Sequence, residues 1–182
     1  MNLPFNTRKA IEAAAVILRA HGKKTTRLRL LKLLYLAERK CLRDTGRGMI
    51  GGKLTIMRHG PLHSAVYDLI KGVHRDEAQW SERFISDGPL LIRLDSEPKM
   101  AALSPYEVET LRELVDFHAQ MDDYDLAEYT HGLPEVKGQR PTGDTSVDLP
   151  VEEVMQCVCP AQHRDEMIAE LKESIAVDAA AK

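Results

Sequence analysis

Apolar residues recur at three- and four-residue spacing in the first 45 residues and predict two helices. The first begins at a cap, Asn6 or Thr7, and ends at Gly22. The second runs from Thr26 to about Arg43, and its leucines leave almost no polar face in its first half. A helix of this kind is buried on most sides, so we expect it to be the central one.

A glycine-dense segment, residues 44–53, follows the second helix and permits a turn with positive φ. Alternating character then predicts a short strand, Lys53–Met57. Residues 58–61 (Arg-His-Gly-Pro) end this strand, and the pattern from Leu62 to Lys71 predicts a helix that has Pro61 at its start.

The second half of the chain begins with short apolar runs between Glu82 and Leu103 that predict one or two strands. Ser104 and Glu107 form a capping-box pattern that opens a further helix. Later predicted elements are a short acidic helix at 122–131, a long loop at 132–149, a helix from Pro150, an amphipathic helix at 161–175 and a frayed tail at 177–182.

These elements predict an α+β fold that is mostly α-helical. We expect a single compact domain of about six or seven helices with a small antiparallel β-sheet or hairpin. Its length of 182 residues, with 43% hydrophobic and 29% charged residues, fits one globular domain. The last helix and tail, residues 161–182, form an appendage to a domain that covers residues 1–160.

Composition excludes several other classes of protein. No apolar run approaches the roughly 18 residues that a membrane helix needs, and residues 1–9 have no apolar segment of signal-peptide type. We therefore expect a cytoplasmic protein without membrane contact. Cys41, Cys157 and Cys159 are an odd number without repeated spacing, so reduced thiols are expected.

The net charge of −3 conceals an asymmetry along the chain. Residues 1–58 hold 14 Lys and Arg against 3 Asp and Glu, whereas residues 59–182 hold 11 against 25. The basic part is able to bind a phosphate backbone or an acidic protein, or to be neutralised by the acidic part within the fold. The sequence favours internal or solvent neutralisation over a partner surface.

The two N-terminal helices also invite comparison with a helix-turn-helix, because a short basic turn, His21–Thr25, joins them. A recognition helix exposes polar side chains to base edges, whereas this second helix begins with leucines. An ordinary helical hairpin is therefore favoured, and nucleic acid is an unfavoured partner.

No catalytic, cofactor or metal site emerges from the motifs. The glycine-dense segment is not a P-loop, because Arg47 and Leu54 stand where glycine and Ser or Thr are required. His59 and His63 are four residues apart, but Gly60 and Pro61 separate them, so a metal site is not expected. We expect no cofactor and no enzyme activity.

Several motifs together resemble the Panacea domain, the family that includes GepA-like proteins and SocA-like antitoxins. They are KLLYLAE at 32–38, the glycine-rich loop to Gly52, MRHGPL at 57–62 with YDL at 67–69, and the segment 126–131. The resemblance covers roughly residues 7–160, and the chain is most similar to the SocA-like branch.

The resemblance implies an antitoxin that binds its cognate toxin directly, the toxin being encoded by the adjacent gene. For the SocA-like branch it further implies a proteolytic adaptor that delivers a SocB-like inhibitor of the replication sliding clamp to ClpX of the ClpXP protease. The alternative from another class is a nucleic-acid-binding regulator that uses the basic N-terminal third. An enzyme with an unrecognised site is the third alternative.

The chain departs from the family pattern at two places. His59 stands where family members commonly have Tyr, and residues 132–136 lack the aromatic residue that commonly follows the Thr-His pair. Polar groups fixed on a rigid turn suit partner recognition, although solvated charges on a structural turn are an equal alternative. The candidate partner-binding residues are Lys53, Arg58, His59, Gly60, Pro61 and His131, and we expect Thr130 and His131 to reach back to the turn.

Overall fold

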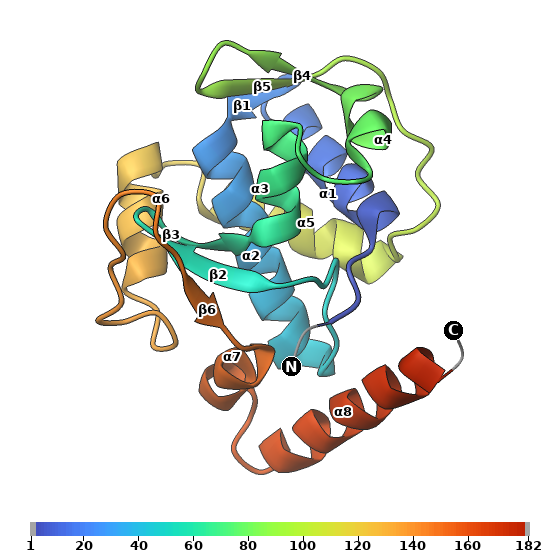
Figure 1. The fold of residues 1–182 in the computed structure, drawn as a ribbon, viewed down its shortest axis with the longest axis vertical. Helices are drawn as coiled ribbons and strands as arrows, with labels where there is room; N and C mark the ends of the chain where they lie inside the picture. The colour runs from blue at the N-terminus through green and yellow to red at the C-terminus, as the bar shows by residue number, and fades with distance from the viewer. Residues whose placement is uncertain (1–2, 181–182) are drawn as a thin grey trace.

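The computed structural model describes residues 3–180, and within that range the chain forms eight helices and two three-stranded antiparallel sheets (Figure 1). The helices are α1 (Thr7–Ala20), α2 (Arg27–Thr45), α3 (Ser64–Lys71), α4 (Glu77–Ser81), α5 (Pro105–Phe117), α6 (Asp123–His131), α7 (Val151–Val158) and α8 (Arg164–Ala180). The strands are β1 (Lys24–Thr26), β2 (Leu54–Met57), β3 (Gly60–His63), β4 (Phe84–Asp87), β5 (Leu91–Leu94) and β6 (Val147–Leu149). The predicted mostly helical α+β fold is confirmed.

Helix α2 is the centre of the fold, as its leucine pattern predicts. It contacts α1, α5, α6, α7 and strand β3 (Figure 1). Thr26 caps its N-terminus through a hydrogen bond from the backbone of Arg29, and Gly46 ends it in the left-handed conformation at φ 68°. The surrounding elements bury twelve of its residues, among them Lys32 and Glu38.

The two sheets lie on different sides of the helices (Figure 1). One has the order β1-β5-β4, and the other has the order β3-β2-β6. Strands β2 and β3 form a hairpin in which Met57 pairs with Gly60, so Arg58 and His59 make a two-residue turn. Both residues of this turn are exposed to solvent.

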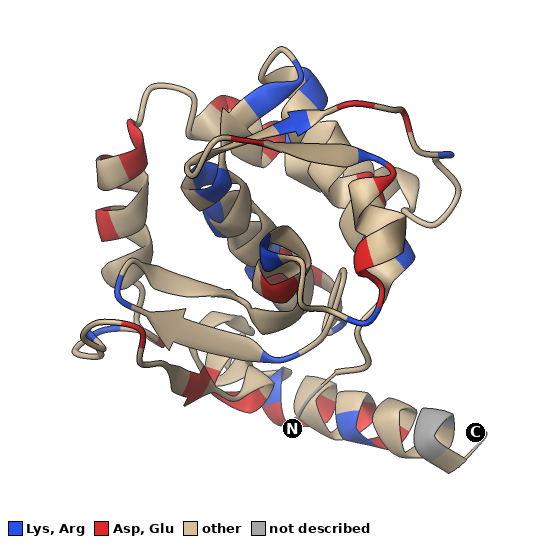
Figure 2. Ribbon diagram, turned by 45° about the horizontal axis from the view of Figure 1, so that its top comes forward, with Lys and Arg blue, Asp and Glu red and all other residues tan. Residues whose placement is uncertain are grey.

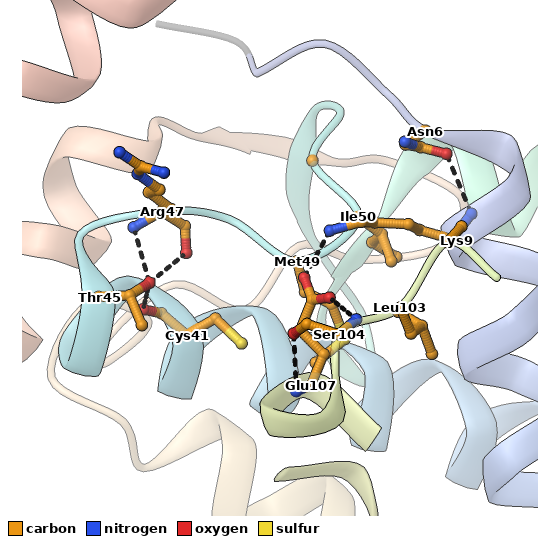
Figure 3. Close-up of polar contacts among 12 residues, drawn as sticks. Asn6, Lys9, Cys41, Thr45, Arg47, Met49, Ile50, Leu103, Ser104 and Glu107 are labelled. Carbon is orange, nitrogen blue, oxygen red and sulfur yellow. Dashed lines mark hydrogen bonds and ion pairs between the residues drawn. The ribbon is translucent and has the colours of Figure 1, made fainter. Parts of the chain in front are cut away.

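The polar signals at helix ends are formed as the sequence predicts (Figure 3). Asn6 caps α1 by accepting from the backbone N–H of Lys9. The Ser104 hydroxyl and the Glu107 carboxylate bond to each other's backbone N–H in a capping box at α5. Lys9 also pairs with Glu107 at 2.6 Å, which ties α1 to α5.

Three local predictions differ from the structure. Helix α3 begins at Ser64 rather than Leu62, because Pro61 belongs to β3, where it pairs with Ile56. β3 is an edge strand, so the missing N–H of proline is tolerated there. Helix α4 is an eighth helix, and its five residues are too few to give a periodic signal. The structure has two sheets where the sequence predicts one small sheet or hairpin. Strands β1 and β6 were not predicted, because three residues are too few for a recognisable alternating pattern.

The last helix, α8, extends along one side of the molecule after α7 (Figure 1). It buries Ile168 and Leu171, and it continues to Ala180, beyond the predicted end at residue 175. Residues 181 and 182 of the predicted frayed tail lie outside the described residues. Among the helices of residues 3–180, none combines the length and the apolar character needed to traverse a bilayer.

Candidate functional site

The β2–β3 turn places two exposed side chains on a constrained backbone. Arg58 and His59 are exposed, whereas Gly60 and Pro61 behind them are buried. Gly60 has φ 96°, and a Cβ atom at this position would lie 2.8 Å from Thr130 Oγ1 and 3.2 Å from Lys32 Nζ. Only glycine fits this backbone conformation and this close approach.

His131 of α6 holds the turn from behind. Its Nε2 donates a hydrogen bond of 3.0 Å to the carbonyl oxygen of Arg58, so the predicted contact between His131 and the turn is confirmed. Burial lowers the pKa of His131, and the nearby hydrogen bond to Arg58 opposes that shift only in part. His131 is therefore neutral at neutral pH and acts as a fixed donor to the turn.

Lys32 of α2 is the residue beside the turn that sequence reasoning missed. Its side chain is buried at 1% exposure, and Nζ donates to the carbonyl oxygen of Pro61 at 2.9 Å. Burial lowers the pKa of this amine to about 7. The signal in the sequence was a lysine inside a run of leucines, where a charge is expensive unless a partner satisfies it.

The structure separates Lys53 from the other candidate residues. Lys53 precedes β2, whereas Arg58 follows that strand, so the two lie at opposite ends of the hairpin. Its ammonium pairs with Asp148 of β6 at 2.6 Å, and both side chains are exposed to solvent. Arg58, His59, Gly60, Pro61 and His131 are brought together, and Lys53 is not.

The turn forms one rim of a cleft of about 490 Å³. The cleft lies between the hairpin, the first half of α2, helix α3, the β4–β5 turn and the loop at residues 143–144. Its apolar lining residues are Leu28, Leu31, Met57, Leu62, Tyr67, Ile70, Pro89 and Leu90. Its basic lining residues are Arg27, Lys32, Arg58, His59 and Lys71, and Asp144 is its acidic one.

Ion pairs inside the fold neutralise most of the basic residues in the N-terminal part of the chain. Within residues 3–180, ten of the 14 basic residues of the N-terminal part form ion pairs, eight of them with acidic residues beyond position 58. The paired residues are Arg8, Lys9, Arg19, Lys23, Lys24, Arg29, Arg39, Lys40, Arg43 and Lys53. Figure 2 accordingly has basic and acidic segments interspersed over the ribbon.

Among the basic residues of the N-terminal part, those that form no ion pair with the described chain lie mainly at the cleft. Arg27, Lys32, Arg47 and Arg58 complete the 14, and three of these four line the cleft. Arg27 donates to the carbonyl oxygen of Gly88 at 3.1 Å, a neutral acceptor that leaves its charge uncompensated. Three of the four N-terminal basic residues without an acidic partner in residues 3–180 therefore line one apolar hollow.

The same pairing weakens the nucleic-acid alternative. Lys23 pairs with Glu97 and Lys24 pairs with Asp87, so two cations of the basic turn already have acidic partners. Helix α2, which would be the recognition helix of a helix-turn-helix, packs against α1, α3, α5, α6, α7 and strands β1 and β3. Twelve of its 19 residues are buried, so most of its surface is not available to a DNA groove.

The glycine-dense loop is organised by a carboxylate of the protein itself. Glu38 of α2 is buried and accepts hydrogen bonds from the backbone N–H groups of Met49, Ile50 and Gly51 at 2.8–3.1 Å. A nest of backbone donors is the arrangement that holds a phosphate in other proteins. Here the donors are already used, which agrees with the failure of this loop to match a P-loop.

Another buried polar cluster joins α2 to the segment after α6. Tyr35 donates to Glu135 Oε1 at 2.9 Å, and Arg39 pairs with the same carboxylate at 2.5 Å. Tyr35 is fully buried. No group of three or more metal-ligating side chains converges within the described residues. The cleft thus combines a rigid turn, apolar walls and cations without an acidic partner in the described chain.

Comparison with known proteins identifies the family. The family model described as "Antitoxin SocA-like, Panacea domain" matches residues 30–135, which is more than half of the chain. The matched range contains the buried residues Lys32, Tyr35 and Glu38 and the whole β2–β3 hairpin. No curated protein and no solved structure gives a match. The chain therefore belongs to the SocA-like antitoxin family, whose defining unit is the Panacea domain.

Proposed function

We propose that this protein is a non-enzymatic antitoxin that neutralises a toxin encoded by the adjacent gene through direct contact. Family membership supports the antitoxin class. Within that class, we propose that the toxin is a SocB-like inhibitor of the replication sliding clamp. We further propose that the antitoxin is an adaptor that delivers this toxin to ClpX of the ClpXP protease.

The toxin contact surface in this proposal is the cleft and its rim. The observation that carries the assignment is the distribution of cations in residues 1–58: most are paired within the fold, whereas Arg27, Lys32 and Arg58 meet at one apolar hollow. Arg58 and His59 are the contact residues in this scheme. Gly60, Pro61 and His131 position them, because they fix the backbone of the turn.

Adaptor action needs a second surface that binds the protease while the toxin is held. We assign this role to α8, which lies beyond the matched range and buries only Ile168 and Leu171 among its described side chains. Its first turn carries Asp165 and Glu166. An exposed helix on one side of the molecule leaves the cleft free for the toxin.

The proposal is tested by co-expression with the product of the adjacent gene, followed by co-purification and a growth-rescue assay. We expect a stoichiometric complex and rescue of growth. Arg58→Glu is expected to weaken the complex at least tenfold, whereas Lys53→Glu, at the other end of β2, leaves it unchanged. Absence of both complex and rescue would refute the antitoxin function.

The adaptor step is tested separately. In a host that lacks ClpX, the complex should still form while the toxin persists and growth is not rescued. Removal of residues 164–182 should have the same effect in a host that contains ClpX. Rescue without ClpX would establish neutralisation by blocking alone and would overturn the adaptor part.

A further inference from the structure

The cleft has the chemical character of a site for an apolar segment. Its volume of about 490 Å³ is within the range of sites that hold several side chains or a small ligand. Leu90, at the β4–β5 turn, lines it and is 71% exposed, although a leucine gains free energy when it is buried. Apolar surface left open in this way is covered favourably by a partner.

The buried amine of Lys32 is a second, independent feature that favours a ligand in the cleft. An ammonium group has three N–H donors, and the hydrogen bond to Pro61 is the one that Lys32 forms within the described residues. The side chain is almost fully buried, so water supplies little compensation. Lys32 also lines the cleft, so a group bound there lies beside a buried amine whose donors are only partly used.

Charge around the cleft determines the sign of that group. Besides Lys32, the titratable and charged residues that line or adjoin it are Arg27 of α2, Arg58 and His59 of the hairpin, Tyr67 and Lys71 of α3, His131 of α6 and Asp144 of the 143–144 loop. Lys71 lies over the Tyr67 ring, 5.1 Å from its centroid, and has no acidic partner in the described chain. One carboxylate faces several cations, so an anionic ligand is complementary.

We propose that the cleft binds an apolar segment of the partner toxin that carries a carboxylate, and that this carboxylate pairs with Lys32 and the neighbouring Arg58. This inference rests on the proposed antitoxin function and adds the chemistry of the segment that is recognised. The apolar walls supply burial, and the cations select an acidic side chain or a chain-terminal carboxylate over a neutral or basic one.

Binding of a carboxylate changes the protonation of Lys32. The pKa of the free amine is about 7, and a bound anion raises it because the charged form gains a partner. Between the free and the bound pKa, binding therefore takes up a proton. Affinity for a carboxylate falls as the pH rises above 7, and the part of this dependence that comes from Lys32 disappears in Lys32→Met.

The experiment uses a matched pair of small probes, 4-phenylbutyrate and 4-phenylbutanol, with the full chain. Chemical-shift titration is carried out at pH 7 and pH 9. We expect the carboxylate to bind at least tenfold more tightly than the alcohol at pH 7, with a smaller preference at pH 9. Equal binding of the two probes at pH 7 would overturn the proposal.

Two variants locate the effect. Lys32→Met is expected to abolish the preference for the carboxylate, and retention of the preference would overturn the role of Lys32. Leu90→Asp changes a largely exposed residue and places a negative charge at the rim, so it tests the same site without disturbing the core. It should weaken 4-phenylbutyrate binding at least tenfold, and unchanged binding would exclude this cleft as the site.

The same variants separate this inference from the proposed function. If the wild-type chain binds the carboxylate probe but not the product of the adjacent gene, the antitoxin function fails and the chemistry of the cleft stands. If the adjacent-gene product binds the wild type and both variants equally well, the antitoxin function stands and the cleft assignment fails.

Discussion

Helix α2 buries two opposite charges, Lys32 and Glu38, and the fold satisfies them to different degrees. Glu38 accepts three backbone hydrogen bonds from the glycine-dense loop. Lys32, six residues earlier, donates one hydrogen bond to the backbone of the hairpin. The hydrogen bonds of Glu38 are therefore supplied by the fold itself. The Lys32 ammonium, at the edge of the cleft, has N–H donors without an acceptor in the described chain. Both residues are buried, and the difference between them is the number of hydrogen bonds that the fold supplies.

The largest effect is expected at Glu38. Glu38→Ala leaves three buried backbone N–H groups without an acceptor, so we expect a loss of about 3–5 kcal/mol in the free energy of unfolding. Denaturant unfolding of the purified variant measures this loss. Glu38→Gln, which keeps one acceptor oxygen, should lose less. A loss below about 1 kcal/mol for the alanine variant would contradict the structural role that we assign to Glu38.

Lys32→Met is expected to change stability in the opposite direction. The pKa of Lys32 falls from its ordinary value of 10.5 to about 7 on folding. The unfolded chain therefore binds more protons between pH 7 and pH 10.5, so this residue makes the wild type more stable as the pH rises through that window. At pH 6 the variant should be about 1–4 kcal/mol more stable than the wild type.

The difference between wild type and Lys32→Met should shrink as the pH approaches 10. Thermal and denaturant unfolding at pH 6, 8 and 10 measure it. Lys53→Met is the matched control, because Lys53 is an exposed lysine at the other end of the hairpin. A constant difference between wild type and Lys32→Met at all three pH values would contradict the depressed pKa.

Gly60→Ala tests the backbone beside Lys32. The added Cβ atom meets Thr130 Oγ1 at 2.8 Å, and φ of 96° is strained for any other residue. We expect a loss of about 1–3 kcal/mol in unfolding free energy and weaker binding of the adjacent-gene product. Gly138→Ala also has a positive φ, but a Cβ there meets no atom within 4 Å, so it provides a control for strain without the clash.

The smallest effect is expected where both partners of a pair are exposed. Lys24 pairs with Asp87 at 2.6 Å, and each side chain is nearly half exposed. Lys24→Glu combined with Lys23→Glu should change unfolding free energy by about 1 kcal/mol or less and leave retention on DNA unchanged at low salt. Salt-dependent DNA binding that this double variant abolishes would revive the nucleic-acid alternative.

Sequence patterns predicted the long elements well because their signals are local. The leucine run placed α2 at the centre, and Ser104 with Glu107 marked the start of α5. The hairpin was only half predicted, because its second strand contains Gly60 and Pro61, which usually end an element. Strand β6 was missed because β2 supplies its pairing from about 90 residues earlier in the chain.

The exposed residues of the candidate site were predicted from the sequence, whereas the buried Lys32 was not. Arg58, His59 and His131 meet at the turn as expected, but nothing local ties Lys32 to Pro61, 29 residues later. Lys53 was included because of its closeness in sequence, and a four-residue strand carries it to the far end of the hairpin. Strand geometry converts a short separation along the chain into a long one in space.

The hydrogen bonds of Glu38 also bear on the order in which the chain folds. They close loops of 11–13 residues, whereas the contact from Tyr35 to Glu135 spans 100. Short loops cost less entropy to close, and local contacts favour rapid folding. We expect α2 and the glycine-dense loop to become structured first, as a template on which the hairpin docks. On the ribosome, this template would be complete before the residues that carry Glu135 are synthesised.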